Sequence, residues 1–323
     1  MVVPIVFTFD NNLIMPASVC ISSLLMNANA GTFYDIYILH SEKCDFSQTV
    51  LVDIPKHYSN CKVTFRTVNS EFITAYEVRG ITTTAYYRLL IPELIPEYDK
   101  VLYSDVDVIF REDLAKYYST DLDGYYMAAV DNASALRPKV QKYIKEKLGI
   151  DHKYGHYYSG NLVINSKKIK EDNIIPIFRQ LAKKEYNQQD MDIINIACYG
   201  KIKPLSPAFC LTNYLTEILI NRKQEMLSFF NEEEIEHALK NGIVHYNGKK
   251  PWRDVCINFD IWWEYYRHSP FYDEEFYFDF FNNKMNELEA MPFIKRLKLL
   301  VRFFIYGRSK KLFKFLKKVF LIL

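Results

Sequence analysis

The apolar run PIVFTFD (residues 4 to 10) is the first of several strand-like segments in the N-terminal half of the chain. A segment with helical spacing follows at 15 to 28, and two further strand-like runs, YDIYILH at 34 to 40 and KVTFRTV at 62 to 68, flank a helical segment at 46 to 57. Strands that alternate with helices in this way form a mainly parallel sheet covered by helices. The sequence therefore predicts an α/β, Rossmann-like, doubly wound fold.

A later run, VLYSDVDVIF at 101 to 110, carries two carboxylates inside an apolar stretch, Asp105 and Asp107. In an extended chain such side chains lie on one side, roughly 6 to 7 Å apart. They repel, and their burial is costly unless a cation or several donors compensate. Because ligands of doubly wound sheets bind beyond the carboxyl ends of the strands, Asp10 is expected at the same crevice. We predict a metal or phosphate site here; a strand-end pair that faces water is the alternative.

The chain has 323 residues, 49% of them hydrophobic, which is an ordinary globular composition. Its six cysteines show no CxxC pair and no metal-ligand spacing, so we expect reduced thiols in a cytosolic protein. The first ten residues have no basic region, and we expect no secretory signal. No stretch approaches 18 apolar residues, so a spanning helix is not expected.

Charge is distributed unevenly along the chain. Residues 295 to 318 contain ten Lys or Arg, and residues 1 to 294 hold 31 basic against 39 acidic residues, a net charge of −8. In the segment 309 to 323, apolar side chains share one helical face and lysines the other. This pattern predicts an interfacial helix on an anionic membrane. A helix packed on a protein surface is the alternative, and nucleic acid is the weakest candidate because no base-reading motif is present.

Seven segments resemble, in order, the motifs of glycosyltransferase family 8, the bacterial lipopolysaccharide galactosyl- and glucosyltransferases. They are IVFTFDNN (5 to 12), TTAYYRL (83 to 89), KVLYSDVDVIF (100 to 110), SGNLVIN (159 to 165), QDMDIIN (189 to 195), LTNY (211 to 214) and HYNGKKPW (245 to 252). The resemblance implies a nucleotide-sugar-binding domain of glycosyltransferase A type at 1 to 265 and a basic, helical, membrane-associating region at 266 to 323. It implies transfer of galactose or glucose from a UDP-sugar to a lipid-linked glycan or lipopolysaccharide-type acceptor, with retention of configuration, at the cytoplasmic face of the cell membrane.

The resemblance also assigns roles to single residues. Asp105, Asp107 and His245 would hold Mn²⁺ or Mg²⁺, and this mixture of carboxylates and imidazole suits Mn²⁺ better. The donor-binding residues would be Thr8, Asp10, Asn12, Arg88, Asp105, Val106, Gly248 and Lys250. UDP-galactose or UDP-glucose would be the donor, with Lys250 on the β-phosphate. Asp131, Asp190 and Asp192 would handle the transferred sugar and the acceptor, and are the candidate catalytic residues.

Three departures from the family pattern leave a second interpretation open. Met191 replaces the usual glutamine of Asp-Gln-Asp, Tyr158 replaces an asparagine before Ser-Gly, and the last motif is one residue shorter than usual. A family 8 scaffold that has lost transfer and binds a glycan or a protein partner is therefore an alternative. A metal-dependent phosphohydrolase is a third, although the motif HYNGKKPW has no role in it.

Overall fold

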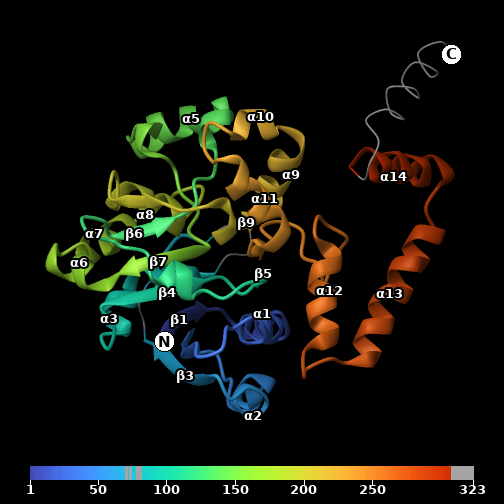
Figure 1. The fold of residues 1–323 in the computed structure, drawn as a ribbon, viewed down its shortest axis with the longest axis horizontal. Helices are drawn as coiled ribbons and strands as arrows, with labels where there is room; N and C mark the ends of the chain where they lie inside the picture. The colour runs from blue at the N-terminus through green and yellow to red at the C-terminus, as the bar shows by residue number, and fades with distance from the viewer. Residues whose placement is uncertain (70–71, 73–74, 78–81, 307–323) are drawn as a thin grey trace. The chain divides into compact units, whose positions relative to one another are not determined.

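The computed structural model describes residues 1 to 69, 72, 75 to 77 and 82 to 306, and it divides the chain into two compact units (Figure 1). The first unit is Met1–Phe271 and the second is Tyr272–Leu323. The first unit contains both β-sheets and every residue predicted to bind the donor or the metal. The predicted amphipathic segment at 309 to 323 lies outside the described residues.

The main sheet has seven strands in the order β3-β2-β1-β4-β7-β6-β8. Their bounds are β3 Cys61–Val68, β2 Phe33–Ser41, β1 Val2–Thr8, β4 Lys100–Ser104, β7 Asn161–Asn165, β6 Met127–Ala129 and β8 Ile202–Pro204. The four strands from β3 to β4 are parallel, as the sequence predicts, and β7 runs antiparallel to both β4 and β6. The sheet is therefore mixed, because the chain enters β7 from the edge at which β4 ends.

Alternate residues of the central strands face two separate apolar cores. In β1, Val3, Ile5 and Phe7 point into one core and Val6 into the other, as the period of two in a strand requires. The first core also contains residues of helices α1 (Ile14–Met26), α9 (Asn213–Asn221) and α11 (Glu232–Asn241). The second contains residues of α3 (Ile91–Leu94), α6 (Ser166–Glu171), α7 (Ile175–Leu181) and α8 (Asp190–Ala197). The sheet thus lies between two helical layers.

The helices of the first unit are mostly short (Figure 1). They are α1 Ile14–Met26, α2 Ile54–His57, α3 Ile91–Leu94, α4 Ala115–Tyr118, α5 Pro138–Tyr143, α6 Ser166–Glu171, α7 Ile175–Leu181, α8 Asp190–Ala197, α9 Asn213–Asn221, α10 Lys223–Met226, α11 Glu232–Asn241 and α12 Phe259–His268. The predicted helix at 46 to 57 is only a 3₁₀ turn, Val50–Asp53, followed by α2. Pro55 explains this, because proline has no N–H and fits only the first turn of an α-helix.

A second, three-stranded sheet brings distant parts of the chain to the carboxyl edge of β4. Its strands are β5 Val108–Ile109, β10 Val244–His245 and β9 Leu211–Thr212, in the order β5-β10-β9. His245 pairs with Val108 on one side and with Thr212 on the other. This register places the motif that begins at His245 directly beside Asp107.

The second unit contains helices α13 (Glu274–Glu289) and α14 (Phe293–Tyr306). Asp273 caps α13 by accepting a hydrogen bond from the Phe276 N–H at 3.0 Å, an interaction that stabilises a helix N-terminus. Among the described residues, no helix combines the length and the apolar character needed to cross a bilayer.

Candidate active site

The two carboxylates of the Asp-x-Asp triplet lie just beyond β4 rather than within it. Strand β4 ends at Ser104, and the Asp105 N–H donates to the Gly160 carbonyl at 2.8 Å, where β7 begins. The Tyr103 hydroxyl donates to Asp105 Oδ1 at 2.6 Å. The predicted position at the end of the strand is therefore correct, but the connection to β5, and not strand pleating, brings the two carboxylates together.

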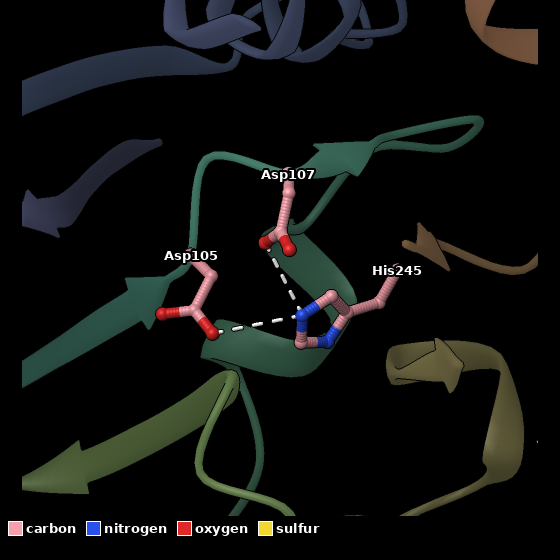
Figure 2. Close-up of side chains that lie close together, drawn as sticks. All are labelled: Asp105, Asp107 and His245. Carbon is pink, nitrogen blue, oxygen red and sulfur yellow. Dashed lines mark ion pairs between the residues drawn. The ribbon is translucent and has the colours of Figure 1, made fainter. Parts of the chain in front are cut away.

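Asp105, Asp107 and His245 converge on one point (Figure 2). His245 Nε2 lies 3.2 Å from Asp107 Oδ1 and 3.6 Å from Asp105 Oδ2. One ligand atom from each residue lies within 4.8 Å of the others. These are the three residues predicted to hold a divalent cation, and the structure brings them together from widely separated parts of the sequence.

The remaining nitrogen of His245 orients the ring for this role. Cys210 Sγ lies 3.5 Å from His245 Nδ1, and both side chains are buried. A metal-binding histidine usually engages its second nitrogen in a hydrogen bond, which fixes the tautomer and the ring orientation. Two carboxylates and a histidine held in this way fit a divalent cation such as Mn²⁺.

Arg88 links the metal-binding cluster to a third carboxylate. It belongs to the 3₁₀ segment Thr83–Leu90 and is only 6% exposed. Its Nη2 donates to Asp105 Oδ1 at 2.8 Å, and its Nη1 lies 3.2 Å from Asp190 Oδ2. Burial by itself lowers the pKa of Arg88, but Asp105 and Asp190 outweigh it and raise the pKa above its ordinary value. Arg88 is thus a permanent cation at the floor of the site.

Lys250 supplies a second cation, which pairs with the other aspartate of the cluster. Its ammonium forms an ion pair with Asp107 and donates to the Tyr246 carbonyl at 2.8 Å. Burial alone would raise the pKa of Asp107, yet Lys250 and then His245 hold that pKa well below its ordinary value. Asp107 is therefore ionised at neutral pH, as a metal ligand must be.

The other predicted donor-binding residues lie at the carboxyl end of β1 and in the loops near it. Thr8 Oγ1 and the Tyr103 hydroxyl are 3.1 Å apart, which joins β1 to β4. Asp10 follows β1 and accepts from the exposed Asn12 N–H at 2.9 Å.

Val106 and Gly248, two further predicted donor-binding residues, would contact a ligand through backbone atoms rather than side chains. The Val106 side chain is buried, so only its backbone remains for a ligand. Gly248, in the loop after β10, has φ +120° and open space where a Cβ would stand, and such a residue permits close backbone approach.

The three candidate catalytic aspartates differ in their surroundings. Asp190, at the first turn of α8, is 5% exposed and is joined to the metal-binding cluster through Arg88. Burial raises the pKa of Asp190, and Arg88 opposes this shift. Asp192 is fully buried, and its Oδ2 accepts from the Tyr143 hydroxyl at 2.7 Å and the Gln188 N–H at 2.8 Å. These contacts make Asp192 an anchor for the start of α8.

Asp131 lies in the segment that follows β6, where it forms a bridge with Tyr157. Its Oδ1 accepts from the Ala133 N–H at 2.7 Å. Burial raises the pKa of Asp131, and hydrogen bonds from the backbone only partly offset this. Because β6 and β4 point the same way in the sheet, Asp131 and Asp105 leave it at the same edge.

The residues that depart from the family pattern lie close to this edge. Met191 is partly buried against the first core, and the Tyr158 hydroxyl accepts from Thr212 Oγ1 at 3.1 Å. Asn161, the first residue of β7, is buried, and its amide nitrogen and oxygen contact no hydrogen-bonding group in the described part of the chain. A buried amide without partners is unusual, so Asn161 has unused hydrogen-bonding capacity at this edge of the sheet.

Two residues at the site were given no role by the sequence. Cys210 reaches His245 only through the pairing of β9 with β10, which no local pattern shows. Gly160 leaves space for the cluster, since a Cβ there would stand 2.8 Å from His245 Nδ1 and 2.9 Å from Asp105 Oδ2. Its place in a Ser-Gly turn was the only available hint.

Comparison with known proteins is consistent with this geometry. The sequence pattern of glycosyl transferase family 8 matches residues 4 to 256. A protein named putative glycosyltransferase from Haemophilus influenzae is 30% identical over 213 residues, which is 64% of this chain and 63% of that protein. Glycosyltransferase GlyF from Streptococcus pneumoniae is 29% identical over 273 residues, 81% of this chain and 60% of that protein. The chain thus spans about three fifths of the length of these relatives.

Solved structures share the fold. The galactosyltransferase LgtC, in complex with donor and acceptor sugar analogs, has a TM-score of 0.66 at 24% identity, covering 84% of this chain and 98% of that one. The bifunctional glycosyltransferase WbbM has a TM-score of 0.69 at 23% identity, covering 85% and 51%. The mixed sheet with its Asp-x-Asp cluster is therefore a glycosyltransferase A fold. With its sequence pattern matched from the first strand of the sheet to just beyond the histidine motif, the chain belongs to glycosyl transferase family 8.

Proposed function

We propose that the protein is a metal-dependent glycosyltransferase that moves galactose or glucose from a UDP-sugar to a lipid-linked glycan or a lipopolysaccharide-type acceptor, with retention of configuration. The observation that carries this proposal is the convergence of Asp105, Asp107 and His245 between two cations, Arg88 and Lys250. Such a cluster suits a ligand that brings both a metal and a diphosphate, as a nucleotide sugar does.

The residues of the site act on two parts of the donor, the diphosphate and the sugar. A bound Mn²⁺ or Mg²⁺ would neutralise the diphosphate as its bond to the sugar breaks. Lys250 adds a positive charge beside the same oxygens, and Arg88 holds Asp105 and Asp190 in place. Asp190, held next to Arg88, is the carboxylate best placed to face the sugar, where positive charge develops at the anomeric carbon.

Release of UDP from the purified full chain tests this function. UDP-galactose and UDP-glucose are each incubated with the protein and Mn²⁺. No acceptor is needed, because donors of this kind are slowly hydrolysed in its absence. We expect UDP release with at least one of the two, and its loss when EDTA removes the metal. If neither sugar nucleotide is bound or turned over in the presence of metal, the proposal is wrong.

A non-catalytic scaffold is the second candidate function, and the Met191 and Tyr158 side chains favour it. A thioether cannot offer the hydrogen bonds of the usual glutamine. If this candidate is correct, Met191→Gln will create UDP-sugar turnover that the parent chain lacks, as measured by UDP release. Turnover by the parent chain would rule this candidate out, and Met191→Leu, which stays apolar, is the matched control.

We further propose that residues 295 to 323 bind the cytoplasmic face of an anionic membrane. This segment contains ten basic residues and no acidic one, and basic amphipathic segments bind anionic lipids through charge and apolar contact. Deletion of residues 295 to 323 should abolish cosedimentation with phosphatidylglycerol vesicles while sugar-nucleotide binding persists. Vesicle binding that survives the deletion would contradict this assignment.

A further inference from the structure

Arg137 is a half-buried cation at the carboxyl edge of the sheet with no role in the donor site described above. Its Nη2 donates to the Asn132 carbonyl at 2.9 Å, directly beside Asp131. Its guanidinium carbon lies 4.7 Å from the centre of the Tyr214 ring. Arg137 pairs with no carboxylate among the described residues, and its buried Nε has no acceptor there. Buried guanidinium groups are normally paired, so Arg137 has capacity left for an anion.

The order of the strands separates Arg137 from the end of the site that would bind the nucleotide. Thr8 and Asp10 follow β1, the metal-binding pair follows β4, and Asp131 and Arg137 follow β6, in the order β1-β4-β7-β6 across the sheet. A donor that spans β1 and β4 therefore leaves the β6 side for the acceptor. Arg137 consequently lies on the acceptor side of the metal-binding cluster.

The platform on which Arg137 rests is tied to the metal-binding histidine. Tyr214 lies in the first turn of α9, two residues after Thr212, which pairs with His245 and bonds to the Tyr158 hydroxyl. An arginine stacked on an aromatic ring presents its planar edge for bidentate contact with a carboxylate or phosphate. A tyrosine face in the same place suits stacking against a sugar ring.

The chain that follows Arg137 is strongly basic, in contrast with the rest of the first unit. Residues 137 to 153 hold six basic and two acidic residues, a net charge of +4, whereas the remainder of residues 1 to 271 holds 24 basic and 31 acidic residues, a net charge of −7. Lysines 139, 142, 145, 147 and 153 of this stretch are exposed. Helix α5 begins directly after Arg137, which lies over the Tyr214 ring of α9. A local positive field of this kind attracts and orients an anionic ligand.

We propose that Arg137 is the anion-binding residue of an acceptor subsite, and that the acceptor is an acidic saccharide with a carboxylate or a phosphate near the hydroxyl to be glycosylated. This inference rests on the proposed glycosyl transfer and adds the chemical class of the acceptor. Arg137 would pair with the acidic group, Tyr214 would support the sugar ring, and Asp131 would face the sugar hydroxyls. The exposed lysines would contribute the longer-range attraction.

Direct binding of small saccharides to the full chain tests this subsite without any donor. The probes are p-nitrophenyl β-D-glucuronide, glucose 6-phosphate and, as the neutral match, p-nitrophenyl β-D-glucoside, each followed by saturation-transfer NMR. We expect at least one acidic probe to bind on the order of 10- to 100-fold more tightly than the glucoside, because hydrogen bonds between charged groups contribute that much. The two acidic probes distinguish a carboxylate from a phosphate.

Three variants test whether Arg137 causes the preference for acidic over neutral probes. Arg137→Gln should remove the preference for acidic probes, Arg137→Lys should keep part of it, and Arg222→Gln, which removes a partly exposed arginine already paired with Glu225, should leave it intact. The thermal midpoint of each variant shows whether it is folded. Equal binding of acidic and neutral probes, or a preference that survives Arg137→Gln in a folded protein, would overturn the inference. Because no donor is used, its failure is distinct from a failure to bind UDP-sugars.

Discussion

Replacing Asp107 with asparagine is expected to remove tight Mn²⁺ binding and to reduce UDP-sugar turnover by about 10³-fold or more, since a metal at a reacting phosphate contributes several kcal/mol. Asp107 is the carboxylate nearest His245 Nε2 and the ion-pair partner of Lys250. The neutral amide provides a weaker metal ligand and leaves Lys250 without its partner, so metal and diphosphate binding both suffer. Electron paramagnetic resonance of free Mn²⁺ measures the first effect, and UDP release measures the second.

The chain contains its own control for this substitution. Asp123 belongs to another Asp-x-Asp triplet, at 121 to 123, and it is exposed in a turn where its N–H donates to Asp121 Oδ1 at 3.0 Å. Asp123→Asn changes the same chemical group outside the metal-binding cluster found among the described residues. It should therefore leave Mn²⁺ binding and turnover unchanged. Equal loss in both variants, or no loss of metal binding in Asp107→Asn, would contradict the assignment of the cluster.

Replacing Gly160 with alanine should weaken Mn²⁺ binding by about 10-fold or more, the size of effect seen when the support of a metal ligand is changed. The added Cβ would stand 2.8 Å from His245 Nδ1 and 2.9 Å from Asp105 Oδ2, so two of the three ligands must move. The Gly160 carbonyl also accepts a hydrogen bond from the Asp105 N–H, so a shift of Gly160 would displace Asp105 at the end of β4 as well. The expected signature is lost metal affinity in a protein that remains folded.

Gly124→Ala separates this steric effect from a general cost of replacing glycine. Gly124 has φ +75° and nothing within 4 Å of an added Cβ. Its replacement should lower the free energy of unfolding by about 1 kcal/mol through backbone strain and leave Mn²⁺ affinity unchanged. If Gly160→Ala binds Mn²⁺ as well as Gly124→Ala does, the close packing around the cluster has no functional importance.

Much of the first half of the fold follows from local sequence pattern. Alternating apolar runs and helical segments predicted the parallel strands β1, β2 and β3, because each strand shows its own periodicity. The antiparallel entry of β7 could not be predicted in the same way. Strand direction depends on which edge the chain reaches through the preceding loops, and residues 111 to 160 show no regular pattern.

The candidate site was predictable only in part, for a similar reason. Asp105 and Asp107 stand out locally, as charges at the end of an apolar strand. His245 is an ordinary histidine until the pairing of β10 with β5 places it beside them, and family resemblance rather than residue chemistry pointed to it. The same resemblance grouped Asp190 with Asp192, whereas the structure pairs Asp190 with Arg88 and buries Asp192 against the Tyr143 hydroxyl.

Calorimetric titration of UDP-galactose and UDP-glucose into the full chain, with and without Mn²⁺, tests whether the cluster binds a sugar nucleotide together with a metal. The arrangement of Asp105, Asp107 and His245 between Arg88 and Lys250 predicts that at least one of the two sugar nucleotides binds, and that its affinity depends on the metal. Binding should disappear in Asp107→Asn and persist in Asp123→Asn. Absence of binding with Mn²⁺ present, or equal binding in its absence, would contradict the account.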